Sequence, residues 1–513
     1  MYKVSTYSKI KPTSDRILQT IPGLITWFMI TSPIWGVLLF PIAYATFLLC
    51  YIIIWFLKSI RTLLFFAYSF YKIHHNVHVK WDSLYLKDNS RDKVKHIVII
   101  PFVKEGYTVL EPLLRSLSRQ TFNTKQIYIC LTYEQRFPQG KDLAEKLYLE
   151  FKEVFGGIWI NEHNLEVGEV VGKGANCASA AKLVKKKVEE LGFDKDYLSL
   201  MACDCDSIFP RHFFSYFTYE FLKEKNRHFI FWAGSMAYMQ NYWDLPHFAR
   251  VFNSANSYFN LATIARSYSK FIQISTFISS YKLFESTDYY EKGVISDDFH
   301  SFFVALFSYA GKVRCQTLFC MVDSDACEGS GIADNAKRLF IQVQRWSWGV
   351  EDFVFLVKNT FLTFKRKDVS LINKLYTASR ALGVIIDHQM WPISGFLFIF
   401  TNIIILYFLK NNEFSIFWSS TSQLLSTIFA ITTITGIIAI IVEFIIRPKH
   451  PYWSSKKFTL KKFLFFFFDS LIEFIHWLLY PVMGIFFGSI PAILSHTILM
   501  LGKHIGFVLT DKK

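Results

Sequence analysis

Three familiar active-site motifs are missing from this sequence of 513 residues. There is no G-x-G-x-x-G to support a dinucleotide-binding fold, and no G-x-S-x-G elbow for Ser-His-Asp hydrolysis. The nearest approach to a phosphate-binding P-loop is "GEVVGKGAN" at 168–176, which is one residue short and has Gly174 where the loop requires Ser or Thr. These absences leave the acidic motifs of the chain as the candidates for chemistry.

Cysteine is scarce, with eight residues in the whole chain. The pair Cys203 and Cys205 and the group Cys315, Cys320 and Cys327 lack the paired spacing of a zinc ribbon, so core or incidental thiols are expected. No finger, homeodomain or RNA-binding signature accompanies the net charge of +15, and nucleic acid is therefore not an expected partner. The positive charge instead suits the anionic head groups of membrane lipids.

Charged residues are absent from the long apolar stretch at 21–57. Because about 20 apolar residues span a bilayer, this stretch is too long for one upright helix. We expect about two transmembrane helices within 21–70, with a break near Pro33 or Pro41. A cleavable signal peptide is not expected, since its apolar region is only about 7–15 residues long.

A second apolar region covers 391–501 and is expected to hold about three to four transmembrane helices. Its clearest segments are 390–409 and 426–446, and 463–501 is long enough for two more. Between these two apolar regions the chain carries a normal mixture of charges, which predicts one large aqueous domain.

Orientation is predicted from the basic residues in the short loops. The link at 447–462 has six of them, whereas the loop at 410–422 has one: Arg447, Lys449, Lys456, Lys457, Lys461 and Lys462 against Lys410. The basic link is therefore expected to be cytoplasmic, and so are the aqueous domain and the tail at 1–20. The sequence predicts a multi-pass protein of the cell membrane.

The aqueous domain alternates strand and helix patterns. Continuous apolar runs at 94–106, 126–134 and 197–206 predict buried parallel strands, and 109–122 and 176–191 predict helices between them. This alternation is typical of a doubly wound α/β sheet, in which ligands bind beyond the carboxyl ends of the strands.

Two acidic motifs stand out in this domain. Asp204 and Asp206 directly follow the third predicted strand, and two carboxylates so placed repel each other unless a cation lies between them. Asp297 and Asp298, in "KGVISDDFHSFF", precede an aromatic helical pattern. Taken alone, the second pair also fits a helix N-terminus with favourable first-turn charge.

A third motif is "RLFIQVQRWSWGVEDF" at 338–353, where Gln342, Arg345 and Trp346 lie on a predicted amphipathic helix. Taken alone, it fits an interfacial anchor next to the membrane, where tryptophan is common.

The order of "IIPFVKEG", "GKGAN", "DCD", "SDD" and "QVQRW" between two sets of apolar segments resembles the membrane-embedded family 2 glycosyltransferases, the group of cellulose, chitin and hyaluronan synthases. The resemblance implies a GT-A type nucleotide-sugar-binding domain at 90–350, built on a doubly wound mixed sheet and flanked by transmembrane α-helices. It also implies an interfacial amphipathic region at 351–390. The implied reaction is inverting transfer of a sugar, most often UDP-linked, to a hydroxyl of a growing polysaccharide or glycolipid.

The resemblance also implies a role for each motif residue. Mg²⁺ or Mn²⁺ at Asp204 and Asp206 would hold the departing diphosphate, and Asp298, or its neighbour Asp297, would be the general base. Acceptor binding falls to Gln342 and Trp346. The residues implied in binding the nucleotide sugar are Glu105, Glu134, Lys173, Asp204 and Arg345.

Departures from the family pattern leave some alternatives open. Ser-Asp-Asp replaces Thr-Glu-Asp, which bears on the choice between Asp297 and Asp298, and Glu134 stands where many relatives have an Asp that reads uracil. The stretch 273–284 lacks the glycine-rich turn of the polymer synthases. Single-sugar transfer to a lipid therefore remains an alternative, as does a non-catalytic binding or transport protein.

One helical face in the second apolar region carries Asp469, Glu473 and His476. Ionisable residues in a membrane span are functional candidates, so these could line a sugar path. The alternative is an interfacial helix whose polar face meets water.

Overall fold

The computed structural model describes residues 13–85, 89–166, 169–266, 271–408, 412–450 and 459–505. Its centre is one seven-stranded sheet with the order β3-β2-β1-β4-β6-β5-β7. The strands are β1 (Lys95–Phe102), β2 (Ile127–Glu134), β3 (Gly157–His163), β4 (Leu198–Ala202), β5 (Ile230–Ala237), β6 (Phe277–Ser280) and β7 (Arg314–Asp323). Only β6 runs antiparallel to its neighbours, β4 and β5, so the sheet is mixed.

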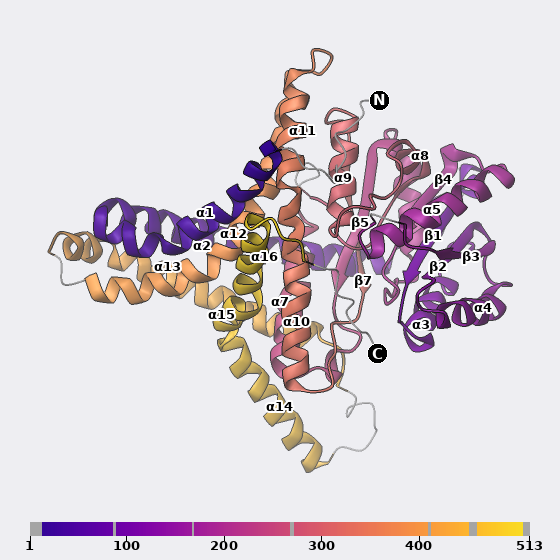
Figure 1. The fold of residues 1–513 in the computed structure, drawn as a ribbon. Helices are drawn as coiled ribbons and strands as arrows, with labels where there is room; N and C mark the ends of the chain where they lie inside the picture. The colour runs from indigo at the N-terminus through magenta and orange to yellow at the C-terminus, as the bar shows by residue number, and fades with distance from the viewer. Residues whose placement is uncertain are drawn as a thin grey trace.

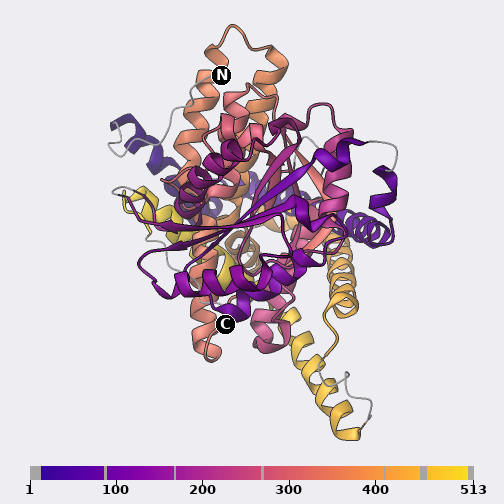
Figure 2. The ribbon, with the colours of Figure 1, turned by 90° about the vertical axis from the view of Figure 1, so that its right-hand side faces the viewer.

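Helices cover both faces of this sheet (Figures 1 and 2). Residues in β1 alternate between two cores, because successive side chains of a strand point to opposite faces. Val98 and Ile100 pack with α3 (Tyr107–Ser118), α4 (Gln139–Phe151) and α6 (Phe213–Lys223). On the other face, Ile97 and Ile99 pack with α5 (Lys173–Glu190), α8 (Tyr281–Ser286) and α9 (Asp297–Ser308). The predicted α/β class is thereby confirmed.

The remaining helices form a largely apolar bundle beside the sheet. The α-helices are α1 (Thr13–Leu39), α2 (Pro41–Val77), α7 (His247–Thr263), α10 (Ile332–Ser347), α11 (Phe353–Lys365), α12 (Leu371–Phe408), α13 (Asn412–Ile446), α14 (Leu460–Leu478), α15 (Tyr480–Met483) and α16 (Ile490–Met500). Short 3-10 helices include η1 (Trp81–Tyr85), η2 (Asn89–Lys93), η3 (Thr124–Gln126), η4 (Lys195–Tyr197), η5 (Arg227–Phe229), η6 (Tyr242–Asp244) and η7 (Trp348–Asp352), and a π-helix, η9, spans Gly484–Ser489.

Four helices of the described chain are long and apolar enough to cross a membrane: Ser14–Leu39, Pro41–Val77, Ser426–Ile446 and Tyr480–Met500. The break between the first two falls at Phe40, directly before Pro41, whereas Pro33 lies inside α1. In Figure 1, α1, α2 and α13 extend away from the sheet on the same side of the molecule. The segment 351–390 comprises the end of η7, α11, a connection at 366–370 and the first part of α12.

Two of the three residues on the polar face of α14, Asp469 and Glu473, are buried, so the alternative in which this face meets water is wrong for them. Asp469 pairs with Arg250 of α7 at 3.2 Å and with His247 at 2.8 Å. Glu473, which is fully buried, pairs with Arg447 at 2.9 Å. These contacts attach α14 to α7 and to the end of α13.

The cysteines of the aqueous domain are free and buried, as expected for core thiols.

Candidate active site

The predicted acidic motifs come together beyond the carboxyl ends of β1 and β4. These two strands are parallel neighbours, so their ends lie at the same edge of the sheet. Asp204 follows β4, α5 begins at Lys173, and α9 begins at Asp297. A segment that returns toward β6 brings Ser275 to the same point.

Ser275 contacts three of the predicted site residues. Its hydroxyl donates a hydrogen bond to Asp204 Oδ2, and its carbonyl accepts one of 3.0 Å from Lys173 Nζ. Its backbone N–H donates to Asp298 Oδ2 at 2.8 Å. Ser275 has φ +57°, a left-handed conformation that costs a non-glycine residue about 1–2 kcal/mol. This unfavourable backbone conformation lets one residue hold two carboxylates at once.

Lys173 supplies the positive charge of this cluster. Its Nζ lies 2.8 Å from Asp204 Oδ1. Burial alone would lower the pKa of Lys173, but the carboxylates of Asp204 and Asp297 outweigh burial and raise it. Lys173 is therefore positively charged at the N-terminus of α5, where the helix dipole adds positive potential.

The two acids of "SDD" differ in environment. Asp297 is only 8% exposed, and burial raises the pKa of its carboxyl to about 7, with Asp298 and Asp204 adding to the effect and Lys173 opposing it. Asp298 is half-buried, and its two oxygens accept from the backbone N–H groups of Ser275 and Phe299, both at 2.8 Å. Asp298 is thus the better exposed of the two acids.

Gly174 explains why this loop departs from a P-loop. A Cβ at this position would lie 2.9 Å from the carbonyl oxygen of Glu291 and 3.1 Å from Cβ of Asp297. A Ser or Thr here would therefore push α5 away from the acid pair.

Asp206 is held by the end of β7. It is 2% exposed, and its Oδ2 accepts from the Ser324 hydroxyl at 2.7 Å and the Asp325 N–H at 2.9 Å. Asp323 lies nearby, and burial, together with the charge of Asp206, raises its pKa to about 6. The two acids of "DCD" therefore have different partners, because Asp204 is held by Lys173 and Ser275.

A divalent metal fits these residues on the chemistry of their donor atoms. Carboxylate oxygens are the ligands that Mg²⁺ and Mn²⁺ prefer, and Mg²⁺ is commonly bound by one or two carboxylates plus substrate phosphates and water. Among the described residues, no group of three or more His, Cys, Asp and Glu side chains is arranged to hold a metal. Asp204 and Asp206 are carboxylates of the kind that such a metal needs, and both oxygens of Asp204 contact Lys173 and Ser275 in this structure.

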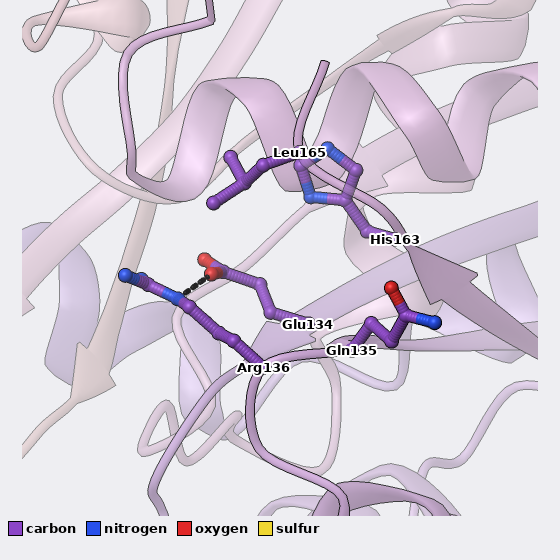
Figure 3. A pocket seen from close by; sticks show the side chains of 5 residues that line it. All are labelled: Glu134, Gln135, Arg136, His163 and Leu165. Atoms are coloured by element: carbon purple, nitrogen blue, oxygen red, sulfur yellow. Dashed lines mark hydrogen bonds and ion pairs between the residues drawn. The ribbon is translucent and has the colours of Figure 1, made fainter. Parts of the chain in front are cut away.

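A cavity of about 300 Å³ opens at the ends of β2 and β3, and its lining includes Glu134, Arg136 and His163 (Figure 3). Glu134 is 1% exposed and forms an ion pair with Arg136, while its Oε1 has no hydrogen-bond partner among the described residues. His163 Nε2 lies 2.9 Å from Glu169 Oε2, and within the described part of the chain its Nδ1 has no partner. The cavity is therefore lined by a carboxylate, a guanidinium and an imidazole.

Glu105 lies in the loop after β1. Its Oε2 accepts a 2.7 Å hydrogen bond from the N–H of Val103, so the side chain shapes its own loop.

The "QVQRW" residues lie on α10, which packs against α7, η9 and α16. Gln342 is 5% exposed, and its Oε1 has no partner among the described residues. The ring of Trp346 stacks on Tyr238, with centroids 6.0 Å apart and an angle of 27° between the planes. Arg345 lies in the last turn of the same helix. These residues thus lie where the bundle meets the sheet domain.

Several contributors to the site were not identified from the sequence, namely Ser275, Asp323, Ser324, Arg136 and His163. Asp323 and Ser324 follow an alternating strand pattern and could have been found in the same way as Asp204. Ser275 carries no such signal, because its role depends on a backbone conformation and on where the chain returns.

No protein-family model matches the chain, and no curated protein matches it in sequence. Among solved structures, the mannosyltransferase PcManGT of Pyrobaculum calidifontis, in complex with GDP-Man and Mn²⁺, is similar with a TM-score of 0.39 and 12% identity, over 75% of this chain and 98% of that one. A fragment of S. aureus TarS in complex with UDP gives a TM-score of 0.35 and 12% identity, over 56% of this chain and 71% of that one. GalNAc-T7 with UDP, GalNAc and Mn²⁺ gives a TM-score of 0.34 and 12% identity, over 60% of this chain and 59% of that one. These neighbours are glycosyltransferases, but at such low TM-scores the function has to be argued from the chain's own residues.

Proposed function

We propose that this protein is an inverting glycosyltransferase that moves a sugar from a nucleotide sugar to a hydroxyl of a glycan or glycolipid at the membrane. The observation that carries the proposal is the convergence of Lys173, Asp204 and Asp298 on Ser275. Positive charge, metal-binding carboxylates and a half-buried candidate base then lie together at the edge of the sheet where such folds bind ligands.

The reaction is a single displacement. The oxygen of the acceptor hydroxyl attacks the anomeric carbon, and Asp298 accepts the proton of that hydroxyl. The bond between the anomeric carbon and the diphosphate oxygen breaks, and its electron pair stays on the diphosphate. Asp298 is preferred to Asp297 because a base must reach the substrate, and Asp297 is the more buried of the two. Lys173 and Arg345 stabilise the charge that develops on the departing diphosphate.

Mg²⁺ or Mn²⁺, when bound with the donor, would supply further charge stabilisation at the diphosphate. Asp204 and Asp206 are the residues proposed to hold it. Ser275 and Ser324 keep these two carboxylates in place through their hydroxyl groups.

A UDP-sugar is the proposed donor, and the cavity at β2 and β3 is the proposed site for its base. Uracil presents one N–H between two carbonyl groups. The carboxylate of Glu134 suits the N–H, and the adjacent Arg136 guanidinium suits a carbonyl. The loop of Glu105 lies next to this position, since β1 and β2 are neighbours.

The remaining parts of the proposal concern the membrane. We propose that the sheet domain is cytoplasmic and of the GT-A type, in a family 2 enzyme of the cell membrane. Gln342 and Trp346 would contact the acceptor, since a flat aromatic face packs well against the C–H face of a sugar.

Release of UDP by the detergent-solubilised protein tests the proposal. Wild type, Asp204→Asn and Asp298→Asn are compared against a panel of UDP-sugars with Mn²⁺ and with EDTA, and Asp368→Asn is the control because Asp368 is exposed after α11. Metal-dependent release with one donor, abolished in both site variants and kept in the control, is expected. Silence with every donor, together with the absence of UDP binding, would contradict the proposal and favour a non-catalytic protein.

A further inference from the structure

Two buried acids follow the "QVQRW" helix directly. Glu351 and Asp352 end the short helix η7 and are 2% and 0% exposed. Buried carboxylates are costly unless other groups pair with them, so their partners indicate why they are there.

Those partners lie on both sides of the acid pair of α9. Glu351 Oε1 accepts a 3.0 Å hydrogen bond from the N–H of Ile295, two residues before Asp297. Asp352 contacts His300 Nδ1 with both oxygens, at 2.9 and 3.0 Å, two residues after Asp298. Neighbouring residues of η7 thus hold the chain immediately before and immediately after "SDD".

The same two segments also approach closely between these contacts. A Cβ at Gly349 would lie 2.7 Å from Cε1 of Phe299, the residue that follows Asp298. Only glycine allows this spacing without movement of the aromatic ring or the helix. The side chain of Glu351 is fixed in turn by the indole N–H of Trp348, which donates to its Oε2 at 2.8 Å, and by His504 at 3.5 Å.

The pairing of Asp352 with His300 joins two buried titratable groups, and burial raises the pKa of Asp352 although His300 opposes it. Burial would lower the pKa of His300, but the carboxylate of Asp352 outweighs burial and raises it. Removing one partner of such a pair leaves an uncompensated buried charge, whereas the pair itself fixes one arrangement of the two segments.

We propose that Glu351 and Asp352 are positioning residues that hold Asp297 and Asp298 in register with the helix α10. The inference rests on the proposed function, in which α10 binds the acceptor and Asp298 takes its proton. Because η7 continues α10 without a loop, any displacement of the acceptor-binding helix is transmitted to the acid pair. The contacts of Lys173 and Asp204 with Ser275 do not involve η7 directly, and Ser275 is the residue that joins them to Asp298.

The experiment compares Glu351→Ala, which removes the acceptor of the Ile295 N–H, with Glu351→Gln, which keeps one acceptor oxygen. Asp352→Asn is the second variant, and Asp368→Ala is the matched control on an exposed acid. Three quantities are measured for each protein: kcat for UDP release, the Kd of UDP with Mn²⁺, and hydrogen exchange of a peptide covering 293–301.

We expect Glu351→Ala and Asp352→Asn to lower kcat by about 10- to 100-fold, the effect of a displacement on the order of 1 Å. The Kd of UDP should change much less than kcat, because neither substitution removes a hydrogen bond of Lys173 or Asp204. Exchange at 293–301 should be faster in Glu351→Ala, and Glu351→Gln should recover part of both losses.

Unchanged exchange and unchanged kcat in both variants would overturn the inference. A weakening of UDP binding in proportion to kcat would overturn it too, since the acids would then support the whole domain. If wild type binds UDP but no donor yields UDP, the proposed function fails, and so does a catalytic role for the link, even where exchange responds as expected.

Discussion

The backbone N–H of Ser275 donates a 2.8 Å hydrogen bond to Oδ2 of Asp298, while the Ser275 hydroxyl donates to Asp204. The candidate base and the candidate metal-binding acid are therefore joined through a single residue. Ser275 makes both bonds in a left-handed backbone conformation, so substitutions can separate the effect of its side chain from that of its backbone.

Ser275→Ala and Ser275→Gly should lower activity equally, because both variants lose the hydroxyl but keep the N–H. Their stabilities should differ, since glycine adopts positive φ without strain. We expect Ser275→Gly to be the more stable by about 1 kcal/mol. Thermal unfolding in detergent checks the predicted stability difference, and UDP release from the same preparations checks the predicted activities. Unequal activities would show that the backbone conformation, and not the hydroxyl, matters for turnover.

Asp298→Asn should abolish transfer, whereas Asp297→Asn should keep measurable activity. The reason is exposure, because Asp298 is half-buried and Asp297 is 8% exposed. Loss of a general base costs about 10²–10⁴-fold. Single-turnover transfer from the donor identified above measures this step. The reverse order of the two activities would assign the base to Asp297, the alternative that the Ser-Asp-Asp sequence leaves open.

Glu134→Gln should weaken UDP binding by about 10-fold, because a hydrogen bond to a charged group contributes about 1.5–3 kcal/mol. The comparison variant is Glu162→Gln on the neighbouring strand, where the side chain is exposed. Titration calorimetry with UDP and with GDP measures the change. Equal affinity of wild type for both nucleotides would contradict the assignment of this cavity to the base.

Asp469→Asn should lower the stability of the protein and leave the Kd of UDP unchanged. Asp469 is the partner of Arg250, and breaking a buried ion pair by removing one partner costs about 3–5 kcal/mol. The polar face of α14 then serves to attach that helix to α7. If Asp469→Asn instead unfolds at the wild-type temperature and makes shorter products, the face would belong to a sugar path.

How far the sequence leads can be judged from these same residues. Asp204 and the acid pair of α9 are recognisable because strand patterns and acidic motifs predict which residues stand at one edge of a sheet. Ser275 is not recognisable, because nothing in "QIST" distinguishes it from a loop serine. The four-residue strand β6, which alone runs antiparallel, is likewise too short to carry a period.

Sequence patterns also do not predict which distant residues contact each other. The spacing of Asp469 and Glu473 places them on one helical face, but it does not say what that face contacts. The packed structure places Arg250 and Arg447 against them. A polar stripe in an apolar segment therefore left two alternatives, and burial decided against the exposed one.

The pH dependence of stability provides a test that does not need a substrate. Burial raises the pKa of Asp297 from 3.8 to about 7, so the folded protein holds a proton that the unfolded chain releases at lower pH. The folded state then binds more protons than the unfolded state between these two pH values, and Asp297 makes stability fall as the pH rises from about 4 to about 7.

Asp297→Asn removes this contribution. In EDTA, we expect the variant to match wild type near pH 4 and to be the more stable by about 4 kcal/mol near pH 8, given about 1.4 kcal/mol for each of about three pKa units. Thermal unfolding across this pH range measures the difference between the two proteins. A difference that does not change with pH would mean that Asp297 is charged throughout, and that Lys173 compensates its charge fully.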